Sequence, residues 1–284
     1  MRCVLAVLLV LCACRGPSPE AGSNTGSGGG SGAARIVALT PSASEVVGAL
    51  GAASLLVGVD EYSTYPPEVA ALPKVGSFLS PNIEAIVRLR PTLVIVDDVH
   101  KEAAGALHDA GLATADCAMH KLADVRGALR SVADRLGRRA EADRAITEID
   151  AALAAAKQRV PSVRPRVLAI IDREAGGLGN LVAAGPASWV DELLAVVGAV
   201  NVLAASPVMY PKLSMEEVLR TQPEVILDLS FAARAKDGAW RDVPVPAVAN
   251  GRVVALAEPY LIAPSPRVKA ALEAISSAVH ARPR

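Results

Sequence analysis

Two stretches of the chain decide its fold: NIEAIVRLRP at residues 82–91 and SMEEVLRTQP at residues 214–223. When they are aligned 132 residues apart, Glu84 falls on Glu216 and a proline closes both stretches. In each copy we predict a short amphipathic helix, with Pro81 at a first helical position in one copy and a capping box in the other. A run typical of a buried strand follows each helix. A repeat of this length predicts two similar lobes, because the units of a solenoid are shorter.

Apolar runs and helical patterns alternate around each repeat. Residues 35–39 indicate a buried strand, and a capping box of Ser42 and Glu45 then begins a helix that ends at Gly51. Residues 166–171 start the second half with a similar apolar run. Because strands that alternate with helices form parallel sheets, we predict an α/β fold of two Rossmann-like lobes, each with a central, mainly parallel sheet.

The middle of the chain indicates one long helix. Apolar side chains recur at positions 142, 145, 146, 149, 152, 153, 156 and 160, which is the spacing of one helix face. Pro161 ends this pattern, and about 20 helical residues span about 30 Å. We therefore predict a first lobe at residues 35–137, a rigid bridging helix at 138–160 and a second lobe at 161–284.

The N-terminus has the pattern of an export signal. A basic start precedes an apolar core at residues 4–11 that is too short to span a bilayer stably. The ending LCAC at residues 11–14 resembles the bacterial lipobox, so we predict a lipoprotein signal peptide at residues 1–14 with lipid on Cys14; an ordinary secretory signal is the alternative. Residues 15–34 are rich in Gly and Ser and predict a flexible tether. Cys117 is then the only other cysteine of the mature chain, and we expect it to be a buried small hydrophobe.

Composition and motifs limit the function classes. The 284 residues are 52% hydrophobic and 20% charged with a formal net charge of zero, which gives no basic footprint for nucleic acid. Residues 176–180 are glycine-rich but do not match the dinucleotide-binding pattern, and we find no nucleophile elbow, Walker loop or zinc-protease motif. We therefore predict no catalysis, with a surface-anchored enzyme and a structural lipoprotein as alternatives.

Several short motifs occur together in a specific order from residue 35 to about residue 280. They are RIVALTPS at 35–42, VGV at 57–59, YSTYPP at 62–67, LPKVG at 72–76, NIE at 82–84, RP at 90–91 and AVANGRV at 247–253. In these motifs the chain resembles the class of periplasmic binding proteins that feed ABC importers of metal chelates: cobalamin, haem and ferric siderophores. The resemblance implies two α/β lobes joined by one long helix, with the ligand held between them.

The resemblance also implies a docking role for the repeated acids. In that class one glutamate on each lobe docks onto arginines of the membrane permease, and the matching positions are Glu84 and Glu216. Two carboxylates on pseudo-equivalent helices suit a symmetric permease dimer. The alternative is that each acid only favours its own helix N-terminus.

Aromatic side chains indicate where a ligand binds. Most of them fall in loops after predicted strands, where α/β lobes bind ligands, and flat rings suit a macrocycle. Resemblance to the cobalamin-binding members puts Tyr65, Phe78 and Tyr210 at pocket positions with Asp97 nearby, and Tyr260 lies in a further loop. We therefore predict a lipid-anchored, monomeric, periplasm-facing protein that captures a cobalamin-like corrinoid for an ABC importer and undergoes only a small closure on binding.

Haem and ferric siderophores stay open as alternative ligands. Tyr65, His100, His108 or His120 would suit the iron of a haem, and the run from Asp97 to His100 would suit a cation. With one such motif and no second cluster, we predict no resident metal and no cofactor apart from the transported chelate.

Overall fold

The computed structural model describes residues 34–235 and 238–281. The predicted signal peptide at residues 1–14, including Cys14, and nearly all of the tether at 15–34 lie outside these residues. Within the described ranges, no helix is both long and apolar enough to cross a membrane.

Parallel strands form the sheet of the first lobe in the order β2-β1-β5-β6. These strands are β1 (Ile36–Ala38), β2 (Leu56–Val59), β5 (Leu93–Val96) and β6 (Thr114–Asp116), beside a short hairpin of β3 (Gly76–Ser77) and β4 (Ser80–Pro81). The helices are α1 (Pro41–Ala49), α2 (Ile83–Arg88), α3 (Lys101–Asp109) and α4 (Asp124–Leu136), with 3-10 turns at Ala53–Leu55, Pro67–Ala71 and Asp98–His100.

The alternation of buried side chains explains how helices cover this sheet. Ile36 and Ala38 of β1 face the core that contains α1, α4 and α5, whereas Val37 and Leu39 face the core that contains α2 and α3. Both faces of β1 are therefore apolar and fully covered, which is typical of a central parallel strand.

The second lobe has a mixed sheet in the order β10-β8-β7-β11-β12, with β9 paired to β7. Its strands are β7 (Arg166–Asp172), β8 (Leu181–Ala183), β9 (Val200–Asn201), β10 (Lys212–Leu213), β11 (Val225–Asp228) and β12 (Val253–Ala255). Its helices are α6 (Trp189–Val196), α7 (Met215–Thr221), α8 (Pro246–Ala249), α9 (Pro259–Ile262) and α10 (Val268–His280), with a 3-10 turn at Phe231–Ala235. Parallel pairs join β9 to β7, β7 to β11 and β11 to β12. Strand β8 pairs antiparallel with both β7 and β10. The predicted two-lobed α/β fold is confirmed.

The sequence repeat corresponds to α2 and α7 with one correction. The predicted capping box of the second copy is present at Ser214. In the first copy Pro81 is not a helical residue but belongs to strand β4, and Asn82 is the N-cap because its side chain accepts a hydrogen bond from the Ala85 amide. Arg90 and Gln222, which precede the two closing prolines, both have left-handed backbones with φ of 48° and 45°.

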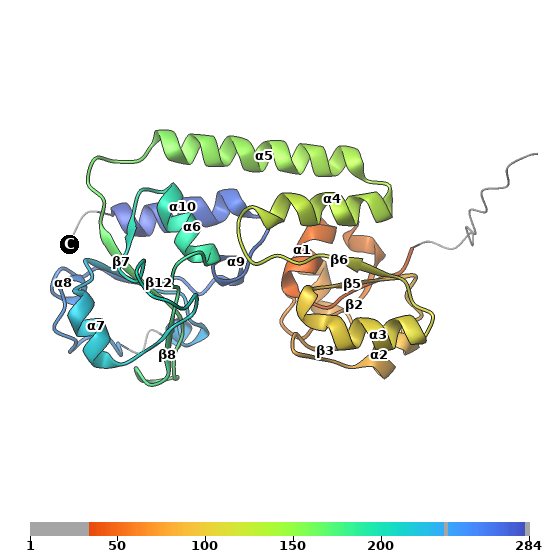
Figure 1. The fold of residues 1–284 in the computed structure, drawn as a ribbon, viewed down its shortest axis with the longest axis horizontal. Coiled ribbons are helices and arrows are strands. Elements are labelled where there is room, and N and C mark those ends of the chain that lie inside the picture. Colours follow the sequence, from red (N-terminus) through yellow and green to blue (C-terminus); the bar gives the residue numbers. More distant parts are fainter. Residues whose placement is uncertain (1–33, 236–237, 282–284) are drawn as a thin grey trace, which may run out of the picture. The chain divides into compact units, whose positions relative to one another are not determined.

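Helix α5 (Arg139–Gln158) lies within the stretch expected to bridge the lobes. It packs against α4 along one half of its length and against α10 along the other half (Figure 1). Its buried side chains, among them Ile146, Ile149 and Leu153, belong to one hydrophobic cluster that also contains β1 and β7 residues. The two sheets are thus separate but share a continuous apolar core along α5. Such close-packed interiors resist deformation.

Candidate ligand-binding site

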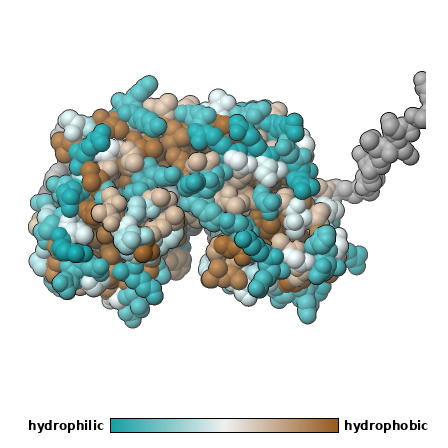
Figure 2. Space-filling view, viewed as in Figure 1, coloured by the Kyte–Doolittle hydropathy of each residue, from teal (hydrophilic) through white to brown (hydrophobic). Residues whose placement is uncertain are grey.

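Each lobe presents apolar side chains where strands end. Four of the exposed large hydrophobic side chains directly follow parallel strands: Tyr62 and Tyr65 after β2, Val99 after β5 and Phe231 after β11. Leu79 lies in the β3–β4 turn, Val208, Met209 and Tyr210 lie before β10, and Ile262 ends α9. Loops at the carboxyl ends of parallel strands share one edge of a sheet, where α/β proteins bind ligands. The surface of the described residues is hollowed between the two lobes (Figure 2). Solvent-exposed apolar groups around a hollow are typical of a ligand site.

Tyr65 and Tyr260 come from different lobes and meet at one cation. The Arg267 guanidinium carbon lies 4.0 Å from the centroid of the Tyr65 ring and 4.3 Å from that of Tyr260. Arg267 is paired with the buried carboxylate of Glu45 in α1. Burial raises the pKa of Tyr260, the Glu258 carboxylate adds to this rise, and the charge of Arg267 opposes it. These two predicted ligand residues are therefore brought together.

Phe78 and Asp97 are linked through His100. The Asp97 amide donates to Nδ1 of His100 at 2.9 Å, so Nε2 carries the proton and donates to the Phe78 carbonyl oxygen at 2.7 Å. The Phe78 ring meets the His100 ring edge-on, with centroids 5.6 Å apart. Because both nitrogens of this buried histidine are occupied, His100 does not fit the role of a metal ligand.

His120, from the loop after β6, reaches the acids instead. Its Nε2 lies 2.9 Å from Asp98 Oδ1 and 3.8 Å from Asp97 Oδ1, and these three residues form a group close enough to hold a cation. Asp97 is only 5% exposed. Burial raises its pKa and the contact with Asp98 raises it further, whereas the hydrogen bonds from Asp97 and His120 lower the pKa of Asp98. Of the two carboxyl groups, Asp97 therefore keeps its proton to the higher pH. His108 lies exposed on α3, away from this group.

Tyr210 belongs to an apolar loop before β10. Its side chain is 40% exposed and follows the exposed Val208 and Met209. The backbone holds this loop in place, because the Gly185 amide donates to the Met209 carbonyl oxygen at 2.7 Å. Burial raises the pKa of Tyr210. The ring is thus partly covered by the protein and partly presented to solvent.

Glu84 and Glu216 occupy equivalent exposed positions. Each is the second residue of its helix and lies in the first turn, beyond the N-cap residues Asn82 and Ser214. Both side chains are exposed. A partner can therefore reach both carboxylates.

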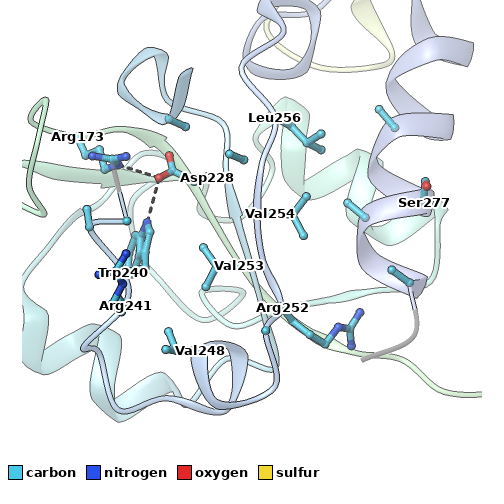
Figure 3. A pocket seen from close by; sticks show the side chains of 18 residues that line it. Arg173, Asp228, Trp240, Arg241, Val248, Arg252, Val253, Val254, Leu256 and Ser277 are labelled. Carbon is cyan, nitrogen blue, oxygen red and sulfur yellow. Dashed lines mark hydrogen bonds and ion pairs between the residues drawn. The ribbon is translucent and has the colours of Figure 1, made fainter. Parts of the chain in front are cut away.

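A cavity of ≈1000 Å³ lies within the second lobe, beside β12 and α10 (Figure 3). Its described lining residues include none of the predicted ligand residues. Its polar wall is satisfied internally: Asp228 Oδ2 accepts from Arg173 Nε at 2.7 Å and from Trp240 Nε1 at 2.9 Å, and Oδ1 accepts from the Ser230 hydroxyl at 2.6 Å. This cavity is thus not the place where the predicted ligand residues meet.

The sequence analysis did not predict some of the contacts between site residues. Arg267 and Glu45 meet across 222 residues, and no local pattern reports such a contact. The exposed position of Phe231 could have been predicted from the repeat. Phe231 follows β11 and lies 132 residues after Val99, and both side chains are exposed. The sequence analysis named His120 as a candidate haem ligand, and its place beside Asp97 and Asp98 could have been predicted because β5 and β6 are neighbouring parallel strands whose ends share an edge.

Comparison with known proteins agrees with this geometry. A family model described as periplasmic binding protein matches residues 36–260. The chain is 29% identical over 249 residues to the vitamin B12-binding protein of Vibrio cholerae, covering 86% of this chain and 88% of that protein. The structure is similar to the periplasmic heme-binding protein RhuT from Roseiflexus sp. RS-1 in apo form, with a TM-score of 0.79, 31% identity, and coverage of 88% and 98%. It is also similar to the periplasmic vitamin B12 binding protein BtuF of Vibrio cholerae, with a TM-score of 0.68, 29% identity, and coverage of 86% and 96%.

Proposed function

Because this chain belongs to the periplasmic binding protein family, we propose that it captures a cobalamin-like corrinoid between its lobes and delivers it to an ABC importer. In general class, this chain is a periplasmic substrate-binding protein of an ABC importer, of the vitamin B12 or haem type. The family and the relatives above are transport proteins and not enzymes.

The exposed aromatic and apolar side chains at the strand ends of both lobes carry the proposal. A corrinoid is a large flat macrocycle with apolar faces, and rings such as Tyr65 and Tyr210 suit such faces. The similarity to vitamin B12-binding proteins supports the same ligand class. In this proposal Tyr65, Phe78, Tyr210 and Tyr260 contact the chelate, and Asp97 lies beside it.

Haem is the second candidate. The TM-score of 0.79 to a heme-binding protein exceeds the 0.68 to the vitamin B12-binding one. The 39% exposed ring of Tyr65 offers a phenol that suits ferric haem iron. A ferric siderophore is the third candidate, on the class resemblance alone.

Calorimetric titration with cobalamin, cobinamide, haem and a panel of ferric siderophores separates these ligands. We expect stoichiometric binding of a corrinoid and weaker binding of the others. Haem bound more tightly than both corrinoids would replace the corrinoid proposal with the haem one, and the absorbance band of the retained chelate reports the identity independently.

Docking is the second part of the proposal. Glu84 and Glu216 project from equivalent helices, one on each lobe, and would meet basic side chains of a dimeric permease. In this arrangement the binding protein acts as a monomer that engages both permease subunits at once.

A lipid on Cys14 would keep the protein at the membrane, with residues 15–34 as the tether. A diacylated or triacylated cysteine supplies enough chains for stable anchoring. Labelling cells with an alkyne fatty acid tests this: we expect label on the native chain and none on Cys14→Ser. Equal label on both chains would show that Cys14 is not the acceptor.

A further inference from the structure

Arg267 is one of the points where side chains tie the two lobes together. It precedes α10 in the second lobe, and its Nε donates to Oε2 of Glu45 in α1 at 2.9 Å while its Nη2 contacts Oε1. This is a bidentate fork, the strongest geometry for such a pair. Ser265 also donates to Glu45, and the Ser42 hydroxyl donates to the Pro264 carbonyl oxygen at 2.8 Å.

The same guanidinium lies between two predicted ligand residues. Tyr65 comes from the loop after β2, and Tyr260 from α9 of the other lobe. The guanidinium carbon lies over both rings, 4.0 Å from the Tyr65 centroid and 4.3 Å from the Tyr260 centroid, so each ring makes a cation–π contact with the same group. Because the Arg267 guanidinium already contacts two rings and the Glu45 carboxylate, its charge is engaged within the protein, and we do not expect it to bind an anionic ligand.

We infer that Arg267, held by Glu45, is the positioning residue of the ligand site: it fixes Tyr65 and Tyr260 at one spacing across the two lobes. The inference rests on the proposed function. A binding site needs its contact residues held by a supporting layer. Here one side chain supports an aromatic from each lobe, so the spacing of the rings and the register of the lobes are set by the same contacts.

The first test needs no ligand. In Arg267→Met the two rings lose the cation between them, and the pKa of Tyr260 rises because Arg267 lowers it in the native chain. Ultraviolet difference titration of tyrosine ionisation should show one phenol shifted to higher pH, absent when Tyr260→Phe is added. Arg234→Met is the matched control, because Arg234 stacks on Phe231 at 4.5 Å and not on a tyrosine. Identical titrations of native chain and Arg267→Met would overturn the inference.

The second test is a double-mutant cycle on affinity for cobalamin, cobinamide and haem. We expect Arg267→Met to weaken binding of the favoured chelate by roughly tenfold, and to have no further effect in a Tyr65→Leu/Tyr260→Leu chain. Equal losses in both backgrounds would overturn positioning and indicate direct contact with the ligand. Arg267→Lys keeps the charge but lacks the flat fork, so it should lose affinity too; full affinity in this variant would count against the stack.

These experiments distinguish a wrong ligand assignment from a wrong role for Arg267. If none of the chelates binds any variant, the ligand assignment is wrong, while the tyrosine titration still decides whether Arg267 holds the two rings. If a variant does not fold, circular dichroism reports it, and the lysine variant, which keeps the ion pair to Glu45, replaces the methionine one in the affinity cycle.

Discussion

Arg35 and Arg166 make the same hydrogen bond in the two lobes. Nη2 of Arg35 donates to the Leu89 carbonyl oxygen at 2.8 Å, and Nη2 of Arg166 donates to the Thr221 carbonyl oxygen at 2.8 Å. Each arginine lies at the start of a central strand and closes the carboxyl end of a repeat helix, where a cation is favourable. The duplication therefore includes the arginines that cap the carboxyl ends of α2 and α7.

Removing either cap should destabilise its own lobe. Arg35→Met and Arg166→Met each leave a helix end without its charged donor, and we expect each to lower the free energy of unfolding by about 1 kcal/mol. Denaturant unfolding measures this. Arg88→Met, on the exposed side of α2, is the control and should change it by less than about 0.5 kcal/mol. An equal loss in the control would contradict the role of the caps.

Charge reversal should separate docking from binding. Glu84→Lys/Glu216→Lys should abolish uptake of the chelate in cells, because two repulsive contacts replace two attractive ones, while calorimetric affinity for the chelate stays unchanged. Glu102→Lys/Glu273→Lys makes the same change of net charge at other exposed positions and should leave uptake intact. Lost affinity in the first variant would refute the docking assignment.

Local sequence patterns predicted the fold but did not predict the contacts between residues far apart in the sequence. Helix spacing around Ile146 and the box at Ser214 depend on neighbours a few residues away, so the sequence displays them directly. The start of α2 was misplaced because a proline is a common first helical residue, yet Asn82 supplies the side-chain acceptor here. The pairing of Glu45 with Arg267 depends on how the lobes meet, which no local rule describes.

The ionised carboxylate of Asp97 should lower the stability of the fold at neutral pH. Burial raises its pKa above 3.8, so between pH 3.8 and the folded pKa the folded chain binds a proton that the unfolded chain has lost. Stability from this group therefore falls as pH rises through that window. Asp97→Asn keeps the acceptor and lets an amide donate to Asp98. We expect Tm to rise by about 2–4 °C at pH 7, corresponding to about 1 kcal/mol, and no difference below pH 3.8.

The control for this prediction is Asp109→Asn at the exposed end of α3, which should leave Tm unchanged. A lower Tm for Asp97→Asn at pH 7 would mean that the charged carboxylate stabilises the fold. Differential scanning calorimetry at several pH values decides between these outcomes.

Cys117 should be inert while the chain is folded. Burial raises the pKa of its thiol to about 12, and the Asp97 carboxylate adds to the rise. At pH 8 only about one thiol in ten thousand is then ionised, and the thiolate is the reactive form. After incubation with iodoacetamide, mass spectrometry of the Cys117 peptide should show modification only if denaturant was present. Rapid modification of the folded chain would contradict the buried environment.

Phe231 should bind ligand at little cost to the fold. Its ring is 73% exposed at the carboxyl end of β11, as Val99 is 51% exposed at the equivalent end of β5. Because the Phe231 ring buries little surface when the chain folds, Phe231→Ser should change the free energy of unfolding by less than about 0.5 kcal/mol. A macrocycle that covers the Phe231 ring removes apolar surface from water, which stabilises the complex. We therefore expect the chelate affinity of Phe231→Ser to be about tenfold lower than that of the native chain. Val163→Ser, at a side chain that is 71% exposed after α5, is the matched control. Unchanged affinity in Phe231→Ser, or an equal loss in the control, would remove Phe231 from the ligand surface.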